Sequence, residues 1–197
     1  MSDLLKTQNF ENFNESYYKN VKIPGTEKTP YENIMNIKNF CMEYVNEFDN
    51  TEKNLLFYGD TGVGKTFMSS CIAKALMDKG KTVLYIRAAR LFKIFEDERF
   101  GRIKEGTEDL YMSDLLIIDD LGTEAESRNN NSYLLELMNE RMVSGKKIII
   151  NTNHNFEQLE RRYSKRFSSR LLENFNMMFF YGDDIRRIKL MNKKRGI

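Results

Sequence analysis

Residues 54–66 read NLLFYGDTGVGKT, an apolar run that leads directly into a glycine-rich loop. The run at Asn54–Tyr58 has the length and composition of a short buried strand. Beyond the loop, apolar residues recur at the spacing of an amphipathic helix: Met68, Cys71, Ile72, Ala75 and Leu76. Gly80 is typical of the residue that follows the end of a helix. We therefore predict a strand, a tight loop and a helix in direct succession.

The loop matches the phosphate-binding pattern G-x-x-x-x-G-K-[ST] without a mismatch. Its glycines let the backbone curl so that N–H groups point at nucleotide phosphates, at the positive end of the helix dipole. In such a loop Lys65 reaches the β- and γ-phosphates, and the Thr66 hydroxyl binds Mg²⁺. A glycine-rich turn that matches by chance is the alternative, and the flanking strand and helix disfavour it. We assign ATP binding to the whole loop: Gly59, Asp60, Thr61, Gly62, Val63, Gly64, Lys65 and Thr66.

A second apolar strand, LLIIDD at residues 115–120, ends in two carboxylates. At the carboxyl end of a strand beside the loop, Asp119 is placed to hold Mg²⁺ through water. Asp120 would then polarise the water that attacks the γ-phosphate. An ordinary turn after a strand is the alternative for this sequence, and the intact phosphate loop disfavours it.

Asn153 follows the apolar strand at residues 147–152, and we expect it at the same edge of the sheet. There it would position the attacking water or contact the γ-phosphate. Asn is also a common turn former after a strand, so this assignment depends on the two preceding motifs.

Short apolar strands alternate with helices along the rest of the chain. Strands are expected at residues 54–58, 82–86, 115–119, 147–152 and 177–181. Further helices are expected at residues 88–98, around residues 134–142, and as two short basic helices near residues 159 and 167. This alternation predicts an α/β fold, a three-layer αβα sandwich around a mostly parallel five-stranded sheet.

The segment before the loop carries a helix start signal. Thr29 can cap a helix that begins at Pro30, and Glu32 completes a capping box, so we expect a helix to about residue 48. With 197 residues the chain is long enough for one core. We predict one domain overall, with residues 1–50 leading into an ATPase core at residues 51–197.

Composition and charge exclude several classes of protein. The formal net charge is only +2, although Lys and Arg concentrate between Arg161 and the C-terminus. The two cysteines form no metal or disulfide pattern. The apolar runs are too short to cross a bilayer, so we predict a cytoplasmic protein without a membrane partner.

Four stretches resemble the signatures of the AAA+ ATPases of the bacterial helicase-loader and IstB-like group, in the same order. They are NLLFYGDTGVGKTFMSSCIAKALMDKG, DLLIIDDLGTE, NERMVSGKKIIINTN and ERRYSKRFSSRLLENF. The resemblance covers most of the chain from Asn54 onward. It implies a P-loop NTPase of the AAA+ type that hydrolyses ATP with Mg²⁺ and forms an oligomer when ATP is bound.

The resemblance also assigns roles to residues outside the motifs. It implies that an arginine of the basic helix, Arg170 first and Arg166 second, enters the neighbouring subunit's site as an arginine finger. Phe13 and Tyr17 are placed near the adenine, although both could be core aromatics. Arg186 is placed as a second sensor of the phosphates, with a surface position as the alternative. Too few residues follow Tyr181 for the usual helical lid, which we expect to be absent or truncated.

Replicative DNA helicase and single-stranded DNA are the partners that the resemblance implies. For DNA it points to the region from Leu91, Phe92 and Lys93 to Arg99, Phe100, Arg102 and Lys104. Cations there can follow phosphates while an aromatic ring stacks on bases. Because acidic residues are interspersed, a solvated helix is the alternative.

These inferences lead to a function and its rivals. We expect a replicative helicase loader, an ATP-dependent switch in DNA replication. An IstB-like transposition helper shares the same motifs and stays open. A small-molecule kinase would need an acceptor pocket that the sequence does not indicate, and a module that binds ATP without hydrolysing it is the remaining alternative. Most AAA+ ATPases have Glu where this chain has Asp120, and a shorter base predicts slow turnover.

Overall fold

The glycine-rich loop connects β1 (Asn54–Gly59) to α3 (Lys65–Asp78), as its sequence predicts. The computed structural model describes residues 6–103 and 106–195. Four more strands complete one sheet: β2 (Val83–Arg87), β3 (Leu115–Leu121), β4 (Lys147–Thr152) and β5 (Phe175–Phe180). Their order is β2-β3-β4-β1-β5, and every neighbouring pair is parallel. The carboxyl ends of β1, β3 and β4 therefore meet at one edge.

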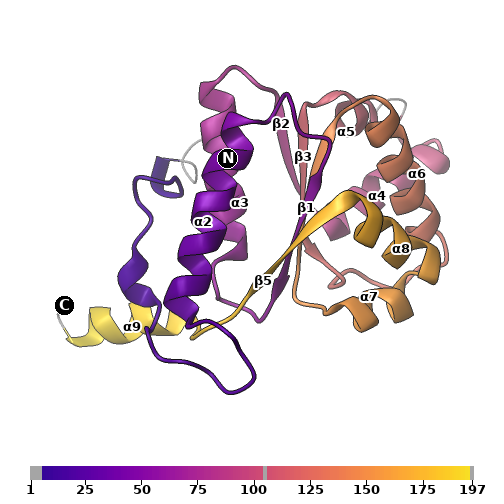
Figure 1. Ribbon diagram of the computed structural model, residues 1–197. Coiled ribbons are helices and arrows are strands. Elements are labelled where there is room, and N and C mark those ends of the chain that lie inside the picture. The colour runs from indigo at the N-terminus through magenta and orange to yellow at the C-terminus, as the bar shows by residue number, and fades with distance from the viewer. Residues whose placement is uncertain (1–5, 104–105, 196–197) are drawn as a thin grey trace.

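Helices cover both faces of the sheet (Figure 1). On one face, α2 (Pro30–Asn46) and α3 pack on a core that includes Leu55, Phe57 and Ile117. On the other face lie α4 (Ala88–Arg99), α6 (Asn130–Val143) and α8 (Lys165–Asn174). They pack on a core that alternates with the first along the same strands, with Leu56, Ile118 and Ile150 among its members. The predicted three-layer sandwich is confirmed.

The expected strands agree with the observed ones within two residues, and the difference at β3 is informative. β3 continues through Asp120 and Leu121 instead of ending at Asp119, and its register with β4 shifts between Ile118 and Leu121. Asp119 and Asp120, which carry the carboxylates, therefore lie within the strand.

Further helical elements lie in the described part of the chain. The prediction of two short basic helices is confirmed by α7 (Phe156–Arg162) and α8. Three elements were not predicted: η1 (Glu15–Tyr17), α5 (Glu108–Met112) and α9 (Ile185–Arg195). The first two are too short to show periodicity, and α9 is dominated by charged residues. In residues 6–103 and 106–195, α9 is the single helix that follows β5.

The predicted capping box at the start of α2 is confirmed. Thr29 Oγ1 accepts from the Glu32 backbone N–H, and the Glu32 carboxylate accepts from the Thr29 N–H. Such a cap is worth about 1 kcal/mol. In the described ranges, no helix combines the length and the apolar character needed to cross a membrane.

Candidate nucleotide-binding site

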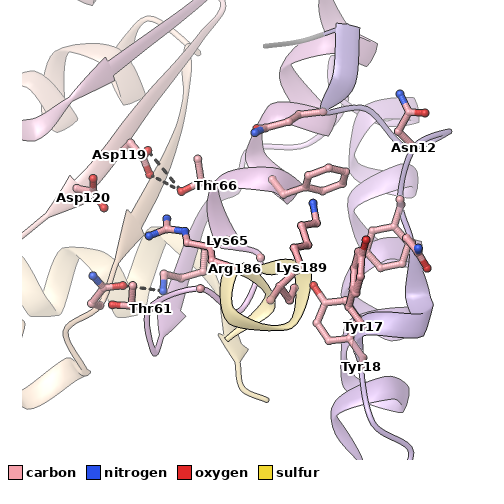
Figure 2. Close-up of a pocket in the computed structure, with 18 residues that line it drawn as sticks. Asn12, Tyr17, Tyr18, Thr61, Lys65, Thr66, Asp119, Asp120, Arg186 and Lys189 are labelled. Atoms are coloured by element: carbon pink, nitrogen blue, oxygen red, sulfur yellow. Dashed lines mark hydrogen bonds between the residues drawn. The ribbon is translucent and has the colours of Figure 1, made fainter. Parts of the chain in front are cut away.

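A cavity of about 270 Å³ lies at the edge of the sheet where β1, β3 and β4 end. The predicted loop, both carboxylates and Asn153 all contribute to its wall. Figure 2 shows their side chains converging from the left, while aromatic residues of the N-terminal segment close the right-hand side. The cavity therefore has a polar end at the strands and an aromatic end at the segment before α2.

The loop conformation depends on its glycines. Gly59 has φ of 131° and Gly62 has φ of 82°, both in the region that favours glycine. A Cβ on Gly59 would lie 1.9 Å from the Phe180 carbonyl oxygen, and one on Gly62 would lie 2.1 Å from Asp184 Oδ1. A side chain at Gly59 or Gly62 would therefore clash with Phe180 or Asp184 unless these moved.

Lys65 is almost completely buried in the wall of the cavity. Its Nζ donates to the carbonyl oxygens of Gly59 (2.7 Å) and Asp60 (2.6 Å) and to Asn153 Oδ1 (2.8 Å). Burial lowers the pKa of Lys65 to about 8, against the opposing effect of nearby carboxylates. A desolvated ammonium with only neutral partners is a strong site for anionic phosphate oxygens.

The oxygen donors suited to Mg²⁺ come from two elements. Thr66 Oγ1, at the start of α3, lies 3.2 Å from Asp119 Oδ1 and 3.5 Å from Asp119 Oδ2, at the end of β3. A hydroxyl and a carboxylate with room for water fit a cation that binds oxygen and retains part of its hydration. The residues that we predicted as metal ligands are therefore in contact.

Asn151, which the sequence analysis did not select, holds Asp119 in place. Its Nδ2 donates to Asp119 Oδ1 and to Ser69 Oγ, both at 2.8 Å. The Tyr85 hydroxyl is buried nearby, and burial together with the Asp119 charge raises the pKa of Tyr85. An amide inside an otherwise apolar central strand was the available signal for Asn151, because a buried amide needs hydrogen-bond partners.

Asp120 has an unusual backbone. Its φ is 57°, and in the described part of the chain no other non-glycine residue lies in the left-handed region. The Asp120 carbonyl accepts from the Thr123 N–H (3.2 Å) and from Thr123 Oγ1 (2.8 Å), which closes a turn. Left-handed residues cluster where function requires a side chain in a particular position. Here the turn directs Asp120 into the cavity beside Asp119.

Aromatic residues form the other end of the cavity. Phe13 and Tyr17, the predicted base-side residues, both line it, together with Tyr18. The Phe13 and Tyr18 rings stack with centroids 5.9 Å apart, and the Tyr18 hydroxyl donates to the Val63 carbonyl of the loop. The N-terminal segment is thereby fastened to the phosphate loop. Sequence reasoning missed Tyr18, because only the folded chain shows which of two adjacent tyrosines faces the loop.

Helix α9 closes the cavity from below. Its Ile185 N–H donates to the Gly62 carbonyl at 3.0 Å, which ties the helix to the phosphate loop. Arg186 and Lys189 project from it into the cavity (Figure 2). Lys189 Nζ lies 5.2 Å from the centre of the Tyr17 ring. The structure thus places Arg186 at the site, as predicted, and adds Lys189, which was not predicted.

Comparison with known proteins identifies the family. Residues 38–179 match the family described as IstB-like ATP binding protein. The chain belongs to this family. It is 27% identical over 166 residues to the replicative helicase loader DnaC of Escherichia coli (strain K12), across 83% of this chain and 68% of DnaC. It is 35% identical over 100 residues to the insertion sequence IS1162 putative ATP-binding protein of Pseudomonas fluorescens, across 49% of this chain and 42% of that protein.

Solved structures share the fold of this chain. The crystal structure of the DnaC helicase loader matches with a TM-score of 0.73 at 20% identity, across 91% of this chain and 99% of that one. AMPPCP-bound DnaA from Aquifex aeolicus matches with a TM-score of 0.71 at 20% identity. This IstB-like chain covers 96% of its own length in that match but only 54% of the DnaA chain.

The two arginines predicted to act on a neighbouring subunit lie outside the cavity of this IstB-like chain. Both are on α8, where Arg166 is exposed and Arg170 is half-buried. Arg170 Nη1 lies 3.9 Å from Glu173 Oε2, a weak contact at the surface. The structure does not bring either arginine to its own phosphate loop.

The predicted DNA region is only partly at the surface. Leu91 and Phe92 are core residues of α4, so that part of the prediction was wrong: their periodic apolar character comes from packing on the sheet. Phe100 is 65% exposed, and the guanidinium carbons of Arg99 and Arg102 lie 5.9 and 5.2 Å from its ring centre. Lys104 lies outside the described residues. The predicted residues that remain exposed in the described part of this region are Phe100 and the cations Lys93, Arg99 and Arg102.

Proposed function

We propose that this protein binds ATP with Mg²⁺ and hydrolyses its terminal phosphoanhydride bond. The observation that carries the proposal is one cavity lined by the phosphate loop and by side chains from the ends of β3 and β4: Lys65, Thr66, Asp119, Asp120 and Asn153. Together they supply what phosphoryl transfer to water needs, namely cationic and N–H donors, oxygen ligands for a metal, and a base. Membership of an ATP-binding family supports the same proposal.

Each residue has a role that follows from its position. The loop N–H groups and Lys65 hold the phosphates, while Thr66 and Asp119 hold Mg²⁺. When bound there, Mg²⁺ would supply positive charge to the phosphates. Asp120 accepts a proton from the attacking water, and Asn153 orients that water. The water oxygen bonds to the γ-phosphorus, the bond to the ADP oxygen breaks, and ADP and inorganic phosphate leave.

The same chemistry gives Arg170 a role between copies. In an ATP-bound oligomer, Arg170 of one copy enters the cavity of its neighbour and neutralises charge on the transferred phosphoryl group, with Arg166 as the second candidate. Their absence from their own cavity and their place on a surface helix support this arrangement. The segment before residue 50 works as part of the same domain, because it supplies Phe13 and Tyr17 to the cavity.

We assign the protein to the helicase-loader type, an ATP-dependent switch in DNA replication. The match to DnaC across 83% of this chain supports the assignment. ATP binding orders an oligomer on a replicative helicase and single-stranded DNA, and hydrolysis releases it. The ring of Phe100, with Arg99 and Arg102 beside it, is the surface that we propose for DNA, because an exposed ring can stack on bases while cations contact phosphates.

An IstB-like transposition helper is the second candidate, supported by the relative from the Pseudomonas fluorescens insertion sequence. The two roles differ in what the ATP-bound protein recruits. Co-purification of the protein with a replicative helicase of its host would support the loader. Co-purification with a transposase on DNA would support the helper instead.

Phosphate release from ATP, without any acceptor, is the test of the chemistry. Wild type should release phosphate, whereas Asp120→Asn and Arg170→Ala should each be inactive alone and regain activity when mixed, because sites would be shared between copies. Arg161→Ala, an exposed arginine on α7, is the matched control and should behave as wild type. Release that requires a metabolite acceptor would indicate a kinase. ATP binding without any release would indicate a binding module.

A further inference from the structure

A buried carboxylate lies just beyond the two aspartates of β3. Glu124 has a side chain only 3% exposed, and its Oε2 accepts from the Gly122 N–H at 2.8 Å. Gly122 belongs to the turn that Thr123 closes onto the Asp120 carbonyl. The Glu124 side chain therefore binds the turn that sets the left-handed conformation of Asp120.

The other carboxylate oxygen of Glu124 binds a different part of the fold. Oε1 accepts from the Tyr163 hydroxyl at 2.5 Å and from Arg162 Nε at 3.2 Å, at the end of α7. Arg162 also donates to the Glu124 backbone carbonyl. Burial together with the hydrogen bond to Glu124 raises the pKa of Tyr163, so the phenol remains a donor. One carboxylate thus joins the Asp120 turn to the α7 terminus.

The α7 terminus is rigidly connected to α8. The Tyr163 and Phe167 rings lie with centroids 4.9 Å apart, and Phe167 is fully buried. Ser168 Oγ on α8 donates to Glu160 Oε2 on α7 at 2.7 Å. The helix pair is therefore one body, and it carries Arg166 and Arg170.

We propose that Glu124 is a positioning residue for hydrolysis: it holds the Asp120 turn in its reactive arrangement by fastening it to the α7–α8 helix pair. This role of Glu124 rests on the ATP hydrolysis that we propose for the protein. Glu124 does not line the nucleotide cavity, so it acts through Asp120 and not on ATP. Asp119 has separate support from Thr66 and Asn151, so the metal ligands remain in place when Glu124 is changed.

The chain offers a matched control for this carboxylate. Glu126 pairs with the same guanidinium, Arg162 Nη1 to Glu126 Oε1 at 3.0 Å, but its side chain is 82% exposed and contacts no part of the Asp120 turn. Glu124→Gln and Glu126→Gln remove the same charge two residues apart. Glu124→Gln leaves a single acceptor oxygen, so the side chain can no longer accept from Gly122 on one side and from Tyr163 and Arg162 on the other, whereas Glu126→Gln changes no buried contact.

The test separates turnover from binding. In Glu124→Gln, kcat should fall about tenfold or more, because small displacements of a reacting group are costly. The Kd for ATP with Mg²⁺ should stay within about twofold of wild type, and Glu126→Gln should match wild type in both measurements. Tyr163→Phe, which keeps the packing, should lower kcat in the same sense, and the double variant should be no slower than Glu124→Gln alone. An unchanged kcat in Glu124→Gln, or equal losses in kcat and ATP affinity, would overturn the proposal.

A second measurement does not depend on hydrolysis. The amide resonances of Asp120 and Gly122 should shift in Glu124→Gln and Tyr163→Phe but not in Glu126→Gln, each compared with wild type at a temperature where thermal unfolding shows all to be folded. If wild type releases no phosphate, the proposed function fails, and these resonances still decide whether Glu124 holds the turn. Unmoved resonances in both variants would overturn the positioning role by themselves.

Discussion

The side-chain amide of Asn151 on β4 donates to Asp119 Oδ1 on the neighbouring strand β3 at 2.8 Å. The same amide donates to Ser69 on α3, so three elements fix one carboxylate oxygen. Asp119 Oδ1 also lies 3.2 Å from Thr66 Oγ1. The position of Asp119, the proposed metal ligand, therefore depends on Asn151, which does not itself line the nucleotide cavity.

Replacing Asn151 with Ala should weaken the use of Mg²⁺. Loss of the amide leaves Asp119 free to rotate, and removal of such supporting hydrogen bonds typically costs roughly 10- to 100-fold in metal affinity. The measurement is the Mg²⁺ concentration that gives half of the Mg²⁺-dependent gain in ATP affinity.

Asn54→Ala is the control for that experiment. Asn54 is also a buried sheet amide, which accepts from the Ile148 N–H at 2.7 Å, but it lies at the opposite end of the strands. It should lower stability without changing the Mg²⁺ requirement. Equal Mg²⁺ requirements in Asn151→Ala and wild type would contradict the role of Asn151.

A physical difference separates the site residues that the sequence could identify from those that it could not. The phosphate loop was predictable because one contiguous motif fixes its backbone, and Asp119 and Asn153 because parallel strands end at a common edge. Glu124 and Asn151 were not, because their roles depend on contacts with residues 39 and 32 positions away. Lys189 was missed because α9 is rich in charged residues, and the sequence does not show which of them faces the cavity. The DNA region that the resemblance indicated included Leu91 and Phe92, and a resemblance does not show which side chains of a helix face the core.

The environment of the Asp114 carboxylate predicts how the stability of the fold depends on pH. Its carboxylate accepts from the Thr82 N–H (2.9 Å) and from Lys146 Nζ (2.7 Å), and these contacts, the one with Lys146 foremost, lower its pKa. A lowered folded-state pKa stabilises the fold above the ordinary value of 3.8, and this contribution is lost as the pH falls below it.

Asp114→Asn should therefore lower the free energy of unfolding at pH 7 by about 1 kcal/mol, because the carboxylate is partly exposed and screened. The difference from wild type should shrink as the pH falls below 3.8. Urea titrations at several pH values measure it, with the exposed Asp49→Asn as the control. A difference that is constant across this range would rule out the carboxylate charge as its cause.

Arg141 is fully buried without a carboxylate partner. Its guanidinium donates to the carbonyls of Leu110 (2.6 Å), Ser113 (2.9 Å) and Lys147 (2.7 Å), so α6 is joined to α5, to the residue after α5 and to β4. Burial lowers the pKa of Arg141 to about 10. Arg141→Ala should cost about 3–5 kcal/mol in unfolding free energy, because it leaves a cavity and unpaired carbonyls. Urea unfolding measures this loss, and the control Arg161→Ala, at an exposed position, should change the unfolding free energy little. A loss under about 1 kcal/mol in Arg141→Ala would show that water satisfies the carbonyls.

The left-handed backbone of Asp120 makes a prediction that separates conformation from chemistry. Asn tolerates this region and Gly adopts it without strain, whereas Ala there costs about 1–2 kcal/mol. Asp120→Asn and Asp120→Gly should therefore unfold at similar temperatures, and Asp120→Ala at a lower one. All three should bind ATP, because Asp120 is not placed on the phosphates, yet none should release phosphate if Asp120 is the base. Residual release in Asp120→Asn near the wild-type rate would instead leave Asp120 as a residue needed only for the shape of the turn.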